Sequence, residues 1–244
     1  MSVVVWEATA RVGGGRSFPA TVVEPSGAAP GSCPVVGFGN GYAHTASRYL
    51  TVLTDLAARG YVVVAPDGET GLWPSHGRLA EDLWGSIQWA RATVPAANHE
   101  RCGVAGHSMG GGAALLAAAR HPQIHTVATF AAAETRPSSI AAVQELTADA
   151  LFVVGSQDRL VPPSRTRRLY AAKPPPRTFA TIAGGYHCGF VDSSPYRGFG
   201  CDSGSISREE QLAVMRSLLG DWLDQHLLGL PRQPVPRGVT VESV

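Results

Sequence analysis

The sequence of 244 residues has few of the features that mark several large classes of protein. No apolar run approaches the ~18 residues that a membrane-spanning helix needs. The formal net charge is only +1, so neither a nucleic-acid-binding surface nor a polybasic membrane anchor is expected. Lys173 is the only lysine, whereas arginines are many. We interpret this as compositional bias and not as a sign of function. The chain contains no internal repeat.

The first residues, MSVVVWEATA, do not have the basic segment and long apolar core of a signal peptide. The chain is therefore expected either to stay inside the cell or to be the mature form of an exported protein. A hydrophobic content of 44% with 16% charged residues is typical of a globular chain. A chain of this length can bury one large core. Residues 1–230 are predicted to form one domain, with a Pro-rich surface tail at 231–244.

Short apolar runs predict eight strands, and apolar stripes at helical spacing predict six helices. The strands are expected at residues 3–10, 19–24, 33–38, 61–65, 102–106, 124–132, 151–155 and 177–182, with glycines 13–15 turning the first hairpin. The helices are expected at residues 45–59, 79–92, 109–120, 140–146, 164–172 and 207–228. This alternation predicts an α/β fold with a mostly parallel sheet of about eight strands and helices on both faces. The connection between residues 132 and 151 is too short for a cap domain, so an open site is expected.

The segment Gly106-His107-Ser108-Met109-Gly110 matches G-x-S-x-G between a predicted strand and a predicted helix. In this context the pattern makes a sharp turn that exposes the serine hydroxyl at the edge of the sheet. The helix behind it offers free N–H groups to an anion. The alternative is a Gly-rich turn with an incidental serine. The flanking strand and helix favour Ser108 as a nucleophile.

A serine nucleophile needs a base to take its proton, and the base needs an acid to orient it. On this type of sheet the order is Ser, Asp or Glu, then His, each just after a strand. Asp158 follows the strand at 151–155, and His187 follows the strand at 177–182. The sequence therefore predicts a triad of Ser108, Asp158 and His187. The remaining candidate acids are interpreted as solvated loop carboxylates: Asp192, Asp202 and Glu134.

The seven other histidines have either the wrong order or the wrong position for the base. His107 lies inside the turn, where its side chain points away from the neighbouring hydroxyl. His44 and His76 lie on loops at the same edge as the serine and are expected to line the pocket.

A tetrahedral intermediate needs two backbone N–H donors for its oxyanion. The residue after the nucleophile supplies one, which is Met109, and the loop after the third strand supplies the other. That loop contains the turn Gly41-Tyr42. The ring of Tyr42 either covers the acyl group or packs within its loop.

The motifs GNGYAHT, ARGYVVVAPD, GHSMGGG, SQDRLVP and GGYHCGF resemble those of α/β-hydrolases between residues 33 and 228. The resemblance is to the branch without a cap domain, which holds bacterial cutinases, polyester (PET) hydrolases and dienelactone-hydrolase-like esterases. It implies the α/β-hydrolase fold and an oxyanion hole at Tyr42 and Met109.

Two departures from that branch bear on the substrate. Polyester-degrading members have a tryptophan shortly after the strand that follows the serine turn, where this chain has Ala132-Ala133-Glu134. Dienelactone hydrolases use a cysteine nucleophile, and this chain has a serine. Trp73 and Phe190 are expected to provide a substitute aromatic wall for the substrate.

The four cysteines are predicted to form two pairs, Cys33 with Cys102 and Cys188 with Cys201. Cys33 and Cys102 begin strands that are neighbours in the resembled fold, within reach of a disulfide, and the alternative is two buried thiols. A bridge between Cys188 and Cys201 would brace the segment after His187. An oxidised pair would favour a secreted protein.

These observations together predict a serine carboxylic-ester hydrolase that acts on small or short-chain esters through an acyl-enzyme. Gly41, His44 and His107 are expected to bind substrate, and no metal or organic cofactor is expected. One alternative is a polyester or cutin hydrolase, and another is a hydrolase-fold binding protein with slow turnover. The expected partner is an ester, small or polymeric, without nucleic acid or a membrane span. The chain is expected to be a monomer or a weak dimer.

Overall fold

One sheet of nine strands runs through the part of the chain that the structure describes. The computed structural model describes residues 1–13, 15–193 and 201–244. The strands in chain order are β1 (Val3–Arg11), β2 (Ser17–Pro25), β3 (Cys33–Gly39), β4 (Val62–Pro66), β5 (Ala97–His107), β6 (Thr126–Phe130), β7 (Asp149–Gly155), β8 (Arg177–Ile182) and β9 (Val239–Ser243). Their order in the sheet is β1-β2-β4-β3-β5-β6-β7-β8-β9. The six central strands are parallel, and β1, β2 and β9 are antiparallel to their neighbours.

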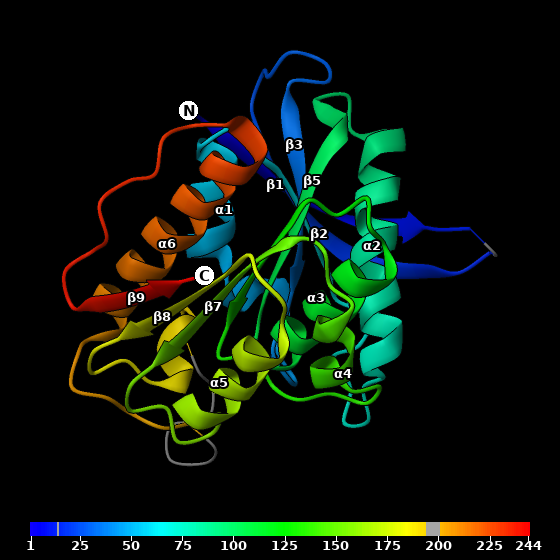
Figure 1. Cartoon of the computed structure of the whole chain (residues 1–244). Coiled ribbons are helices and arrows are strands. Elements are labelled where there is room, and N and C mark those ends of the chain that lie inside the picture. Colours follow the sequence, from blue (N-terminus) through cyan, green and yellow to red (C-terminus); the bar gives the residue numbers. More distant parts are fainter. Residues whose placement is uncertain (14, 194–200) are drawn as a thin grey trace.

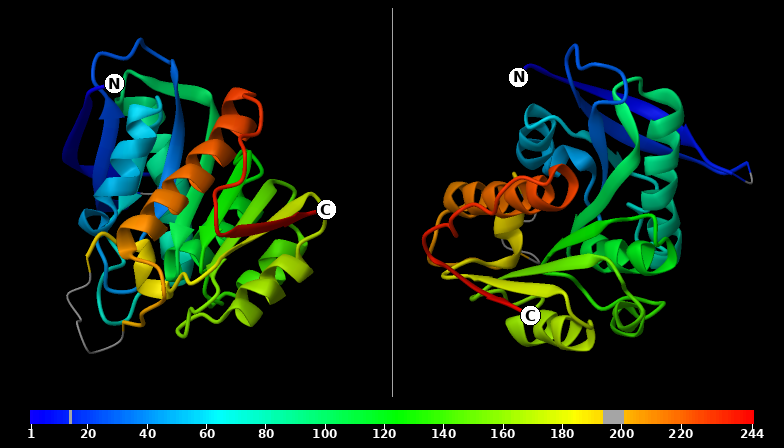
Figure 2. Two further views of the ribbon diagram at one scale, coloured as in Figure 1. Left: turned by 90° about the vertical axis from the view of Figure 1, so that its left-hand side faces the viewer. Right: turned by 45° about the horizontal axis from the view of Figure 1, so that its top comes forward.

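Helices cover both faces of this sheet, as Figures 1 and 2 show. α1 (Leu50–Ala58) and α6 (Arg208–Leu228) lie on one face. α2 (His76–Thr93), α3 (Met109–Arg120), α4 (Ser139–Gln144) and α5 (Pro163–Ala172) lie on the other. Two short 3₁₀ helices, η1 (Ala46–Arg48) and η2 (His187–Phe190), precede α1 and follow β8. The mostly parallel sheet between two helical layers confirms the predicted fold class.

The core is divided in two because the strands send alternate side chains to opposite faces. On β3, Val35 packs into the layer with α2 and α3, whereas Val36 and Phe38 pack into the layer with α1 and α6. Every residue of β3 is buried. Strands buried on both faces are expected to be continuously apolar, which is why the central strands could be recognised as short apolar runs.

The connection from β6 to β7 holds only the short helix α4, which packs against α3 and α5. It forms no separate cap over the carboxyl ends of the parallel strands. None of the described helices is both long enough and apolar enough to cross a membrane.

Two segments differ from the sequence prediction. The predicted helix at 45–59 is divided at Tyr49, whose φ of −130° separates η1 from α1. The Pro-rich tail ends in a strand, β9, which pairs antiparallel with β8. This strand was not predicted; it supplies partners for the backbone groups along the edge of β8, which would otherwise be unpaired. Of the predicted glycine turn, residue 14 lies outside the described residues.

Candidate active site

Ser108 lies at the turn between β5 and α3 with a strained backbone of φ 54° and ψ −119°. Two glycines make this turn possible. A β-carbon on Gly106 would lie 2.4 Å from the carbonyl oxygen of Gly110, and one on Gly110 would lie 2.1 Å from the carbonyl oxygen of Gly39. The same close approach sets the loop after β3 directly against the serine turn.

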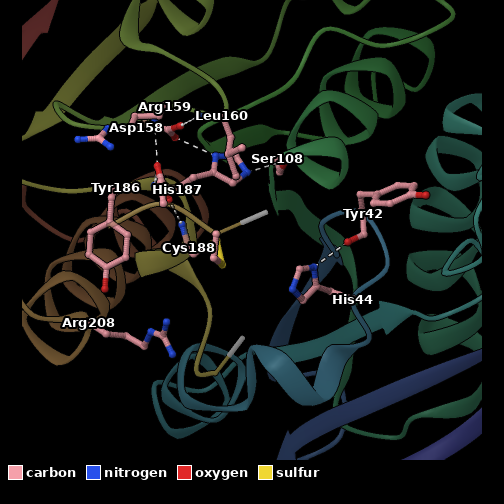
Figure 3. The surroundings of a disulfide bond; sticks show 12 residues. Tyr42, His44, Ser108, Asp158, Arg159, Leu160, Tyr186, His187, Cys188 and Arg208 are labelled. Carbon is pink, nitrogen blue, oxygen red and sulfur yellow. Dashed lines mark hydrogen bonds and ion pairs between the residues drawn. A yellow bond between two sulfur atoms is a disulfide. The ribbon is translucent and has the colours of Figure 1, made fainter. Parts of the chain in front are cut away.

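Three side chains form a continuous series of hydrogen bonds at the carboxyl ends of the strands, which Figure 3 shows. Ser108 Oγ is 3.0 Å from His187 Nε2, and His187 Nδ1 is 2.8 Å from Asp158 Oδ2. The carboxylate of Asp158 is fully buried, and an ionised carboxylate can only accept hydrogen bonds. His187 therefore donates from Nδ1, which leaves Nε2 free to accept the proton of Ser108.

Asp158 and His187 reach this arrangement from two neighbouring strands. Asp158 follows β7, and its Oδ1 accepts hydrogen bonds from the N–H groups of Leu160 and Val161 at 3.0 and 2.7 Å. These bonds fix the direction of its other oxygen. His187 begins η2 after β8. The structure thus brings together the three residues that the sequence predicts as a triad.

Of the three histidines expected at the pocket, His107 and His44 line it. The ring of His107 is buried, with its centroid 4.6 Å from the ring of His187. Burial lowers the pKa of His107 well below its usual 6.5, with the neighbouring histidines adding to the effect. His44 Nδ1 contacts the carbonyl oxygen of Tyr42 at 2.8 Å, and burial lowers its pKa as well. Both rings are therefore neutral at neutral pH. The expectation that His76 lines the pocket is wrong, because His76 is not among the described residues of its wall and accepts a hydrogen bond from the N–H of Arg136.

The candidate oxyanion donors lie on either side of the close approach between the β3 loop and the serine turn. Met109 is the first residue of α3, and the first N–H groups of a helix have no acceptor within it. The N–H of Gly41 donates to the hydroxyl of Tyr49 at 2.9 Å. Within the Gly41-Tyr42 turn, Tyr42 is therefore the candidate donor. The oxyanion roles of Tyr42 and Met109 stay predictions.

A pocket of about 670 Å³ opens over Ser108. Tyr42, 49% exposed, and Leu160, 41% exposed, form part of its wall, so the pocket meets solvent beside apolar side chains. Among the described residues that line it, Arg165 is the one permanently charged side chain and none is a carboxylate. The described wall of the pocket is therefore largely apolar, with a positive charge from Arg165.

Three of the five residues expected to bind substrate line this pocket: Gly41, His44 and His107. The expectation for Phe190 is wrong, because its ring is fully buried and packs against Phe130 and His107 in the core. Trp73 does not line the pocket either. It is 93% exposed on the loop between β4 and α2, next to Leu72, whose carbonyl oxygen accepts a hydrogen bond from the Tyr42 hydroxyl.

One of the two predicted disulfides is present. Cys188 and Cys201 are bonded, whereas the predicted bridge between Cys33 and Cys102 is wrong, since both are buried free thiols. β3 and β5 are neighbours, but their register sets Cys33 opposite Ala97 and Cys102 opposite Val35, with an irregularity between them.

Two residues of this region were not singled out as functional by sequence reasoning. Tyr49 was recognised only as part of an apolar helical stripe, and Asp202 was interpreted as a solvated carboxylate. The hydroxyl of Tyr49 is 3.0 Å from His107 Nδ1, and the carboxylate of Asp202 accepts backbone hydrogen bonds beside His187. The position of Asp202 directly after Cys201 was the one available signal. Within residues 1–13, 15–193 and 201–244, no three His, Cys, Asp or Glu side chains are grouped as metal ligands would be.

Comparison with known families gives one match. The sequence model of the family described as serine aminopeptidase, S33, matches residues 32–139, less than half of the chain. This region runs from the start of β3 to the start of α4, so it contains the Gly41-Tyr42 turn and Ser108 but not Asp158 or His187. No curated protein matches the chain.

Proposed function

We propose that this chain, a serine hydrolase with the α/β-hydrolase fold, cleaves carboxylic esters of small or short-chain acyl groups through an acyl-enzyme. The observation that carries the proposal is the hydrogen-bonded series from Ser108 through His187 to the buried Asp158. A hydroxyl, an imidazole and a carboxylate in that contact are the parts that nucleophilic acyl transfer needs.

The reaction would proceed in two halves. His187 Nε2 takes the proton of Ser108 as Oγ attacks the ester carbonyl carbon, and the N–H groups of Tyr42 and Met109 stabilise the oxyanion. The carbon–oxygen bond to the alcohol then breaks, and the alcohol leaves with the proton from His187. Water, deprotonated by His187, attacks the acyl-enzyme in the same way and releases the acid and Ser108. Asp158 stabilises the imidazolium in both halves without taking its proton.

The lining of the pocket favours an ester over the amino-terminal residue of a peptide. An aminopeptidase must bind the ammonium group of its substrate, for which a buried carboxylate is the usual partner. No carboxylate is found among the described lining residues, and Arg165 would repel a cation. The aminopeptidase activity named in the family description therefore has no evident anchor in this pocket.

A polyester hydrolase is the second candidate. Its support is a set of exposed apolar side chains, of which Tyr42 and Leu160 form part of the pocket wall. Exposed Leu72 and Trp73 lie on the loop whose Leu72 carbonyl oxygen accepts a hydrogen bond from the Tyr42 hydroxyl. Against it, Ala133 forms the wall on the side of β6, where the resembled polyester hydrolases have a tryptophan nearby. Rates on p-nitrophenyl esters from C2 to C12, together with release of soluble products from a polyester film, distinguish the two. We expect the highest rates on the short esters and little release from the film.

The test of the proposal is turnover of p-nitrophenyl butyrate by the purified chain and by Ser108→Ala. Loss of the nucleophile should lower the rate by several orders of magnitude. Ser217→Ala is the matched control, because the hydroxyl of Ser217 donates to Asp221 within α6 and lies outside the pocket. A folded Ser108→Ala variant that keeps a tenth of the wild-type rate would exclude Ser108 as the nucleophile. A wild-type chain that neither turns over the ester nor reacts with a fluorophosphonate would instead be a hydrolase-fold binding protein.

A further inference from the structure

The carboxylate of Asp202 joins the two loops that carry the candidate acid and base. Its Oδ2 accepts hydrogen bonds from the N–H groups of Arg159 and His187, each at 3.0 Å. Its Oδ1 accepts one from the N–H of Cys188, also at 3.0 Å. Arg159 follows Asp158 directly in the chain. One side chain therefore holds the loop after β7 and the loop after β8 together.

The Cys188–Cys201 disulfide restrains Asp202 in this place. Cys201 directly precedes Asp202, and its sulfur is bonded to Cys188, whose N–H is itself a donor to Asp202. Figure 3 shows Arg159, His187 and Cys188 close together, with the imidazole of His187 directed towards Ser108. Cys201 lies 13 residues after Cys188 in the chain. The disulfide between them keeps the carboxylate of Asp202 against the backbone of His187.

The physical consequence concerns the position of the imidazole. Charge-assisted hydrogen bonds to backbone N–H groups are shorter and stronger than neutral ones. Three of them on one carboxylate limit the movement of His187 relative to Asp158. A displacement of the order of 1 Å in a reacting group can lower a rate by about a hundredfold. The imidazole is held by hydrogen bonds at its two ring nitrogens and by contact with the ring of His107, and its position also depends on the backbone that carries it.

We propose that Asp202 is a positioning residue, which holds the backbone of His187 and the loop of Asp158 in the arrangement that lets His187 accept the proton of Ser108. This inference rests on the proposed ester hydrolysis. Asp202 touches neither the substrate nor the reacting atoms, and it acts through His187 and Asp158. The disulfide contributes by keeping Asp202 in place.

The test compares Asp202→Asn with wild type by kcat and KM on p-nitrophenyl butyrate. The amide has nearly the same size, but its NH2 group cannot accept a hydrogen bond, so at least one N–H loses its partner. We expect kcat to fall by roughly tenfold to a hundredfold and KM to change by less than about threefold, because binding of the ester is not altered. The rate at which a fluorophosphonate labels Ser108 should fall in parallel.

Asp192→Asn is the matched control, since Asp192 lies on the same segment after His187. Its carboxylate accepts a hydrogen bond from the N–H of Thr51 at the start of α1 and none from the described residues of the two loops. We expect its kcat to stay within about twofold of wild type. Should Asp202→Asn fail to fold, Asp202→Glu compared with Asp192→Glu makes the same test.

The role of the disulfide is measured by the double substitution Cys188→Ser, Cys201→Ser, alone and combined with Asp202→Asn. If the disulfide acts by holding Asp202, the combined loss in kcat is smaller than the product of the separate losses. Independent, multiplying losses would overturn this part of the proposal. A folded Asp202→Asn variant with the kcat of Asp192→Asn, or with a raised KM alone, would overturn the positioning role. Slower labelling of Ser108 in Asp202→Asn, in a chain without ester turnover, would retain the positioning role and reject the proposed ester substrate.

Discussion

The hydrogen bond between Ser108 Oγ and His187 Nε2 makes these two residues one unit in the proposed reaction. His187→Ala should therefore be nearly as damaging to kcat as Ser108→Ala, and the double variant should be little worse than either. His121→Ala is the control, because His121 pairs with Glu81 at the surface. Steady-state kinetics of wild type, the two single variants, the double variant and the control make the comparison. Losses that multiply in the double variant would show that the two side chains act separately.

Tyr49 connects the Gly41-Tyr42 turn to the turn that carries Ser108. Its hydroxyl accepts from the N–H of Gly41 at 2.9 Å and contacts His107 Nδ1 at 3.0 Å. Burial raises the pKa of Tyr49 above its usual 10, so the hydroxyl stays protonated at neutral pH. It therefore contacts the N–H of Gly41 and the ring of His107 at the same time.

Tyr49→Phe removes both bonds at little change in volume. We expect kcat to fall by roughly tenfold with KM nearly unchanged, which is less than the ~10²–10³ for loss of a direct oxyanion donor. Tyr61→Phe is the matched control, since the buried Tyr61 donates its hydroxyl to Asp224 of α6. An equal loss of kcat in the two variants would mean that Tyr49 matters only for packing.

Among the elements, α2 carries an ionisable group whose burial makes stability depend on pH. Asp82 has a fully buried side chain paired with Arg16 at 2.5 Å. Burial raises its pKa from 3.8 to about 6, and the opposing effect of Arg16 is smaller. Between these two values the folded chain holds a proton that the unfolded chain has released. The free energy of unfolding contributed by Asp82 therefore falls as pH rises from about 4 to 6 and is constant above that.

Asp82→Asn removes this dependence. We expect the stability of wild type relative to Asp82→Asn to fall by at most about 3 kcal/mol between pH 4 and pH 7. Urea unfolding of both chains at several pH values measures it. Glu81→Gln, which changes the exposed neighbouring carboxylate of α2, should alter stability by less than about 1 kcal/mol at each pH. A difference for Asp82→Asn that is flat or rises with pH would contradict the prediction.

At the scale of the whole molecule, the connection between β6 and β7 holds only the short helix α4. Among the described residues, exposed Tyr42 and Leu160 form part of the pocket wall, so the pocket meets solvent directly. We expect the rate on a dissolved short ester such as tributyrin to saturate smoothly. Measurement across its solubility limit should show no increase at that concentration. A jump there would indicate a lid, and the loop after β4, which carries Leu72 and Trp73, would be its first candidate.

The sequence by itself determined most of the elements and the three residues of the predicted triad, because both depend on local pattern. Strands buried on both faces are continuous apolar runs. The pattern G-x-S-x-G between a strand and a helix indicates a sharp turn, because only glycine fits at Gly106 and Gly110. Parallel strands end at one edge of the sheet, so residues that follow β5, β7 and β8 must meet there. Ser108, Asp158 and His187 could be selected by this argument alone.

Only the tertiary structure decided what depends on register and on the direction of a side chain. The irregular pairing of β3 with β5 offsets Cys33 from Cys102, and η2 turns Phe190 into the core. The edge of β8 recruits β9 from a tail whose composition indicates no strand. Asp202 and Tyr49 act on backbone N–H groups, which are present at nearly every residue and leave no pattern in the sequence. Their roles arise only when the fold brings distant segments together.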